Sequence, residues 1–75
     1  MDFGRLAEII AEVMNLDPGM IQKDTSFVED LGADSLDVYQ IMINIEEEMQ
    51  VELNVDEVEK VKTVGDVLEL LNMSE

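Results

Sequence analysis

The sequence contains no cysteine and no histidine. A chain without cysteine has no disulfide framework, no thiolate nucleophile and no thiolate metal site. A chain without histidine lacks the commonest general base and the commonest metal ligand. The 75 residues suffice for one domain with a single small core, which leaves little room for a deep active site. We therefore expect residues 1–75 to form a single domain that is not an enzyme and holds no metal.

Basic residues are scarce as well: 4 Lys and Arg stand against 19 Asp and Glu, for a formal net charge of -15. Such a chain is not expected to bind nucleic acid, because phosphate backbones require positive charge. From Asp24 to Glu59 there are 12 acids and no base at all. An acidic run is often only a solvated face, but the exclusion of every base over half the chain favours a docking surface for positively charged partners.

Long apolar runs are also absent. No segment approaches the length of a membrane span, and the first residues, "MDFGRLAEII", lack the basic segment and long apolar core of a signal peptide. We expect a cytoplasmic protein that works as a monomer.

Apolar residues recur at helical spacing in several segments. The spacing predicts a first helix over residues 2–14, a second over 35–49 and a last helix that Thr63 caps. A short third helix is expected over 56–60. The predicted fold is therefore all-α: a small antiparallel bundle of three main helices plus one short helix.

A long connection separates the first two predicted helices. Residues 16–34 show no clean period and carry turn signals at Pro18, Gly19 and Gly32. Structureless loops of this length are uncommon in compact domains and are usually functional. We expect an ordered loop, held on the core by its isolated apolar residues Ile21, Phe27, Val28 and Leu31.

The second predicted helix is apolar around much of its circumference. Its main stripe has the spacing of a buried face and consists of Val38, Ile41, Met42, Ile45 and Met49. Leu36, Tyr39 and Ile43 form a second stripe, which so small a protein cannot bury completely. These three residues are either ordinary residues at the edge of the core or an exposed apolar contact surface.

Ser35 stands at the start of this helix, between Asp34 and Asp37. As a catalytic nucleophile it would need a base, and no histidine is there to supply one. As a helix cap it would need no further function, although Asp34 is itself a good candidate N-cap. A third possibility is an attachment point, modified by another enzyme that brings its own base and metal. The neighbouring residues alone leave the second and third possibilities open.

The stretch "SFVEDLGADSLD", from Ser26 to Asp37, resembles the prosthetic-group site of acyl carrier proteins, in which the serine of an Asp-Ser-Leu motif carries 4′-phosphopantetheine. The resemblance continues in register through "IEEEM", "VDEVEKV" and "KTVGDVLELL", and so covers nearly the whole chain. It implies a four-helix fold with Ser35 at the start of the second helix. It also implies a covalent arm, derived from coenzyme A, whose terminal thiol carries acyl groups as thioesters.

The resemblance further implies roles for individual residues. Asp34, Leu36 and Asp37 would frame Ser35 for a phosphopantetheinyl transferase. Fatty acid synthesis enzymes with basic docking patches would recognise residues of the second and short helices, namely Leu36, Tyr39, Ile43, Glu46, Glu47, Glu48 and Asp56. A cleft for the acyl chain would be lined by core-facing residues, namely Phe27, Val28, Ile45, Leu53, Val58, Val61 and Leu68. Without the resemblance, each member of this cleft list would be interpreted simply as core.

The resulting prediction is a carrier of growing chains in fatty acid synthesis. One alternative is a carrier of another pathway, such as a D-alanyl or polyketide carrier. The other is an acidic interaction module without a covalent cofactor, which could bind calcium. The sequence shows no loop with the ligand spacing of a calcium hand.

Overall fold

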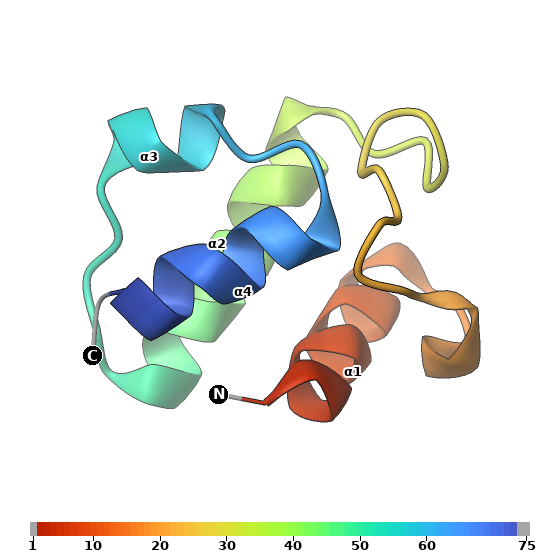
Figure 1. The fold of residues 1–75 in the computed structure, drawn as a ribbon, viewed down its shortest axis with the longest axis horizontal. Helices are drawn as coiled ribbons and strands as arrows, with labels where there is room; N and C mark the ends of the chain where they lie inside the picture. Colours follow the sequence, from red (N-terminus) through yellow and green to blue (C-terminus); the bar gives the residue numbers. More distant parts are fainter. Residues whose placement is uncertain (1, 74–75) are drawn as a thin grey trace.

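The structure is a computed structural model that describes residues 2–73. Its helices are α1 (Phe3–Met14), the 3-10 helix η1 (Pro18–Met20), α2 (Ser35–Met49), the short α3 (Val55–Glu59) and α4 (Val64–Met73). Figure 1 shows α1 and α2 running in opposite directions beside each other, with α3 at the end of the molecule where α2 begins. The predicted all-α bundle of three main helices plus one short helix is confirmed. Within residues 2–73, no helix is long and apolar enough to cross a membrane.

Both ends of α1 are determined locally. A side-chain oxygen of Asp2 accepts a hydrogen bond of 2.8 Å from the backbone N–H of Arg5, which makes Asp2 the N-cap. The helix ends at Asn15, which adopts a left-handed conformation with φ of 58°. The face that carries Leu6 and Ile10 is completely buried, as the helical spacing predicts.

The core lies among α1, α2 and α4, and the long loop adds one aromatic ring to it. The largest side chains with almost no exposed surface are Leu6, Ile10, Phe27, Ile41, Met42, Ile45, Val64, Val67 and Leu71. Burial of this apolar surface is the main favourable contribution to folding. The main stripe of α2 thus faces the core, as predicted, with Val38 and Met49 half-buried at its edges.

The loop over residues 21–34 is held by backbone hydrogen bonds to the end of the α3–α4 connection and to the first residue of α4. The N–H of Phe27 donates to the carbonyl oxygen of Lys62 at 3.0 Å, and the N–H of Val64 donates to that of Thr25 at 3.0 Å. A single antiparallel bridge lies between these two bonds. The expectation of an ordered loop is therefore confirmed, although the backbone pairing that orders it leaves no periodic signal in the sequence.

The apolar residues of this loop face the core with one exception. Ile21 and Phe27 are buried, and Leu31 is half-buried against the core. Val28 is 68% exposed, so the prediction that it faces the core is wrong. Residues 27–31 form a turn, in which the carbonyl oxygen of Ser26 accepts hydrogen bonds of 3.1 Å from the N–H groups of Asp30 and Leu31. In this turn the side chain of Phe27 is buried, and the next side chain, that of Val28, lies on the exposed side.

The start of α4 is fixed by Thr63, the cap that the sequence predicts. Its hydroxyl accepts a hydrogen bond of 3.2 Å from the N–H of Asp66. In return, Asp66 Oδ2 accepts hydrogen bonds of 3.0 Å from the N–H groups of Lys62 and Thr63, which hold the pKa of this carboxyl below its ordinary value. Gly65 lies next to the long loop, and its N–H donates to the carbonyl oxygen of Lys23 at 2.7 Å.

We predict that Gly65→Ala destabilises the protein by about 1–3 kcal/mol, because the new methyl group overpacks this contact. A Cβ on Gly65 would lie 2.9 Å from the Lys23 carbonyl oxygen, and backbone atoms cannot move aside as a flexible side chain can. Urea denaturation followed by far-UV circular dichroism measures the change.

Gly4→Ala in α1 is the matched control. Its Cβ would meet only Asp2 Oδ1, at an ordinary 3.6 Å. We expect Gly4→Ala to be neutral or to stabilise by up to about 1 kcal/mol, because alanine is the better helix former. Equal stabilities of the two variants would contradict the importance of the close approach at Gly65.

Candidate functional site

α2 begins with a reciprocal pair of hydrogen bonds between Asp34 and Asp37. The N–H of Asp37 donates to Asp34 Oδ1 at 2.9 Å, and the N–H of Asp34 donates to Asp37 Oδ2 at 3.2 Å. This capping box binds two backbone donors that the helix start would otherwise leave without partners. Asp34 is therefore the N-cap that the sequence predicts, and both carboxylates next to Ser35 have a structural role.

Ser35 is the first residue of α2 and is exposed. Its hydroxyl makes no hydrogen bond to any other residue among residues 2–73. Of the two possibilities that the sequence leaves open, the helix cap is wrong, because Asp34 caps the helix instead. The fold thus presents an accessible hydroxyl at the positive end of a helix dipole.

A cleft of about 510 Å³, here called the Ser35 cleft, opens beside this hydroxyl. It lies between the start of α2 and α3, which Figure 1 shows next to each other. Its lining residues are Val28, Ala33, Asp34, Ser35, Val38, Tyr39, Val58, Glu59 and Val61. Because this lining is mainly apolar, the Ser35 cleft can accept an apolar group that is attached at its edge.

The structure brings some of the predicted cleft residues together and not others. Val28, Val58 and Val61 line the Ser35 cleft. The other members of that list pack in or against the core and are not among the lining residues: Phe27, Ile45, Leu53 and Leu68. Ala33, Val38 and Glu59 also line the cleft and were not predicted from the sequence. Val38 could have been found from its spacing, because it lies one helical turn after Ser35.

The second apolar stripe of α2 is only partly covered, as expected for a stripe that so small a protein cannot bury completely. The exposed fractions are 76% for Leu36, 42% for Tyr39 and 41% for Ile43. Leu36 directly follows Ser35, and Tyr39 also lines the Ser35 cleft. The stripe therefore forms an apolar surface next to the hydroxyl.

The acids expected to recognise partners differ in their surroundings. Glu46 Oε2 accepts a hydrogen bond of 3.1 Å from the N–H of Leu53, so this side chain holds the segment that follows α2. Glu47 and Asp56 are exposed, and their carboxylates make no hydrogen bond to another described residue. Within residues 2–73, no three acidic side chains converge closely enough to hold a metal ion.

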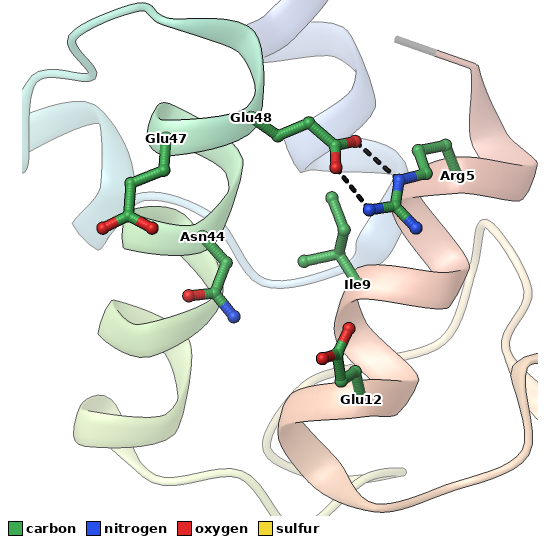
Figure 2. A pocket seen from close by; sticks show the side chains of 6 residues that line it. All are labelled: Arg5, Ile9, Glu12, Asn44, Glu47 and Glu48. Carbon is green, nitrogen blue, oxygen red and sulfur yellow. Dashed lines mark hydrogen bonds and ion pairs between the residues drawn. The ribbon is translucent and has the colours of Figure 1, made fainter.

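Glu48 is paired with Arg5 of α1, as Figure 2 shows. Arg5 Nε donates to Glu48 Oε2 at 2.6 Å, and Arg5 Nη2 donates to Glu48 Oε1. The hydrogen bond from the guanidinium lowers the pKa of Glu48 and raises the pKa of Arg5. The pair borders a second cavity of about 360 Å³ between α1 and α2, which is also lined by Ile9, Glu12, Asn44 and Glu47.

Comparisons of the sequence and of the structure with known proteins both find similarity to acyl carrier proteins. Residues 4–71 match the family model described as a phosphopantetheine attachment site. An acyl carrier protein of Wolinella succinogenes is 42% identical over 66 residues, which cover 88% of this chain and 87% of that protein. An acyl carrier protein of Clostridium acetobutylicum is 43% identical over 68 residues, which cover 91% of this chain and 88% of that protein.

A solved structure of a candidate acyl carrier protein from Mycobacterium tuberculosis has the same fold. It superposes with a TM-score of 0.90 at 27% identity, and the match covers 97% of both chains. Fold and site thus define a phosphopantetheine-binding protein. The chain belongs to the acyl carrier protein family.

Membership of this family establishes the general function. The chain is an acyl carrier with a covalently attached 4′-phosphopantetheine, as the resemblance in sequence implies. Proteins of this family interact with a phosphopantetheinyl transferase and with synthesis enzymes.

We predict that Glu48→Gln lowers the free energy of unfolding at pH 7, and that this loss disappears in acid. Arg5 holds the pKa of Glu48 below its ordinary value of 4.5. The contribution of the ionised carboxylate is therefore complete above about pH 4.5 and is lost as the pH falls through the lower pKa of the folded state. Urea denaturation of the parent and of Glu48→Gln, at pH 7 and at several lower pH values, measures the difference in their free energies of unfolding.

Glu47→Gln is the matched control, because it removes the same charge from the adjacent, unpaired position. It should be neutral or stabilising at pH 7, since it relieves repulsion in a chain of net charge -15. Identical pH profiles for the two variants would show that the ion pair with Arg5 contributes nothing.

Proposed function

We propose that Ser35 is the attachment point of the 4′-phosphopantetheine arm, and that the chain carries growing fatty acyl groups on this arm as thioesters. One observation carries the proposal: the hydroxyl of Ser35 is exposed, has no hydrogen-bond partner among residues 2–73 and lines an apolar cleft. In this proposal residues 1–75 act as one carrier domain, which presents the acyl group and catalyses no step itself.

The surroundings of Ser35 suit a phosphate ester. The ester would lie at the N-terminal end of α2, where the helix dipole and the first backbone amides favour negative charge. Asp34 and Asp37 hold this end in place through their own hydrogen bonds and leave the serine hydroxyl unengaged. The transferase supplies the base and coenzyme A supplies the phosphate, so the absence of histidine is no obstacle.

The arm supplies a thiol, which a chain without cysteine cannot provide. The protein's own contribution is to position the arm and to shelter the acyl chain. Val38, Val58 and Val61 offer apolar surface in the cleft that begins at the attachment point. An acyl chain attached through Ser35 can therefore leave water without detaching from the carrier.

Partner recognition would combine the exposed stripe with the acids around it. Leu36, Tyr39 and Ile43 offer apolar contact to the transferase and to the synthesis enzymes. Glu47 and Asp56 are exposed and unpaired, and so are available to basic patches on these partners. Opposite charges of this kind raise encounter rates and fix orientation more than they raise affinity. We place this activity in the cytoplasm, with the carrier acting as a monomer.

Fatty acid synthesis is the pathway we propose, since the curated relatives described above are named simply as acyl carrier proteins. The identity of the enzyme that acylates the modified protein separates this pathway from D-alanyl and polyketide pathways. Efficient loading by a D-alanine ligase and none by a fatty acid enzyme would favour the other pathway.

We predict that incubation with coenzyme A and a phosphopantetheinyl transferase adds one phosphopantetheine group to the chain, and that Ser35→Ala abolishes this gain. Intact-mass spectrometry measures the addition. Ser26→Ala is the matched control, because it removes a serine hydroxyl from the preceding loop, where Ser26 Oγ accepts a hydrogen bond from the N–H of Glu29. Modification of a folded Ser35→Ala variant would overturn the proposed site.

We predict that Asp34→Ala lowers stability by about 1 kcal/mol through loss of the N-cap, whereas Asp34→Ser, which retains a capping oxygen, keeps most of it. If the transferase also recognises the carboxylate of Asp34, both variants are modified more slowly than the parent. Denaturation curves and modification rates separate these two roles. Modification of Asp34→Ser at the parent rate would mean that Asp34 acts only as a cap.

A further inference from the structure

Tyr39 lies where the exposed stripe of α2 meets the Ser35 cleft. It follows Ser35 by four positions, so the two side chains lie on the same face of α2, one helical turn apart. Both residues line the cleft, and Tyr39 is 42% exposed. Ile43, one further turn along this face, is 41% exposed but is not among the lining residues. Tyr39 therefore stands at the mouth of the cleft, next to the attachment point.

The chemistry of Tyr39 differs from that of the residues around it. The other apolar lining residues are aliphatic and offer no hydrogen-bond donor from their side chains. Tyr39 combines an aromatic ring with a hydroxyl, and this hydroxyl makes no hydrogen bond to another described residue. Such a side chain suits a position where one end contacts apolar atoms and the other remains wet or binds a polar group. A pantetheine arm presents both kinds of surface, because it alternates amide groups with apolar carbon.

We propose that Tyr39 covers the mouth of the Ser35 cleft over the arm and its acyl chain, and so protects the thioester from attack by water and other nucleophiles. This inference rests on the proposed function, because it requires the arm to start at Ser35. Because Ser35 and Tyr39 both line the cleft one helical turn apart, a chain that enters the cleft from Ser35 starts beside Tyr39. The thioester joins arm and chain, so sheltering the chain also draws the thioester toward this mouth.

The sequence provides a direct probe, because Tyr39 is the single tyrosine and the chain contains no tryptophan. Tyrosine fluorescence therefore reports on this one site. Quenching by acrylamide is compared among the unmodified protein, the protein with the free arm and the protein with a hexanoyl group on the arm. We expect quenching to weaken in the hexanoyl form by roughly twofold or more, because the ring would lose most of its 42% exposure. Equal quenching in all three forms would overturn the proposal.

A chemical test measures protection without any partner enzyme. The hexanoyl form is treated with hydroxylamine, which cleaves thioesters, and loss of the hexanoyl group is followed by mass spectrometry. We expect cleavage of Tyr39→Ala to be roughly three- to tenfold faster than that of the parent, the range that corresponds to loss of one aromatic contact. Tyr39→Phe keeps the ring but loses the hydroxyl, and its cleavage rate should lie between those of the parent and of Tyr39→Ala.

Ile43→Ala is the matched control, since it removes an apolar side chain of equal exposure from the same face of α2 without touching the cleft. It should be cleaved at the parent rate. Cleavage of Tyr39→Ala at the rate of Ile43→Ala would overturn the role of Tyr39 while leaving Ser35 as the attachment point. Failure of the transferase to modify Ser35 at all would overturn the proposed function itself, and this inference with it.

Discussion

The two hydrogen bonds between Asp34 and Asp37 are the interaction on which the site depends. They fix where α2 begins, and α2 carries Ser35, one wall of the Ser35 cleft and the exposed apolar stripe. The capping box sets the first turn, which contains Ser35, while the buried residues Ile41, Met42 and Ile45 set the orientation of the rest of the helix. The capping box also removes the need for Ser35 to act as the cap. A hydroxyl that is both exposed and unengaged is thus a consequence of where the carboxylates lie.

Hydrogen bonds from backbone N–H groups to carboxylates also help a chain of net charge -15 to remain compact. With 4 bases in the sequence, few acids can form ion pairs. Many acids instead accept hydrogen bonds from backbone N–H groups near the starts of helices or turns: Asp2, Asp17, Asp30, Asp34, Asp37 and Asp66. Negative charge at such positions interacts favourably with the helix dipole and with amides that lack other partners. Acids whose carboxylates accept no hydrogen bond from another described residue, such as Glu47 and Asp56, remain available to partners.

The sequence predicted helices better than it predicted the site. The start of α2 and the cap of α4 were predicted correctly because Asp34 and Thr63 act on backbone groups within three residues, so the signal is local. The exposure of Val28 was not predicted, because it depends on the turn over residues 27–31, which leaves no periodic signal in the sequence. Nor does apolar character distinguish residues that fill a core from residues that line a cleft in it. The ion pair of Arg5 with Glu48 joins residues 43 positions apart, so the spacing of residues in the sequence could not predict it.

The two walls of the Ser35 cleft differ in how firmly they are held, which matters for a carrier that must both shelter and release a chain. The α2 wall belongs to a helix of 15 residues whose main stripe is buried in the core. The opposite wall is formed by Val28 and Ala33 of the long loop, by Val58 and Glu59 of α3 and by Val61. α3 is a helix of five residues that begins at the cap Asn54 and buries Val58. Helices this short are not stable on their own, so α3 holds its position mainly through contacts with the rest of the molecule. In the proposed function, an acyl chain in the cleft would contact both walls, because Val38 lines it on one side and Val58 and Val61 line it on the other. The wall that carries Ser35 is therefore anchored by the buried face of a long helix, whereas the α3 part of the opposite wall is held mainly by packing contacts such as that of Val58.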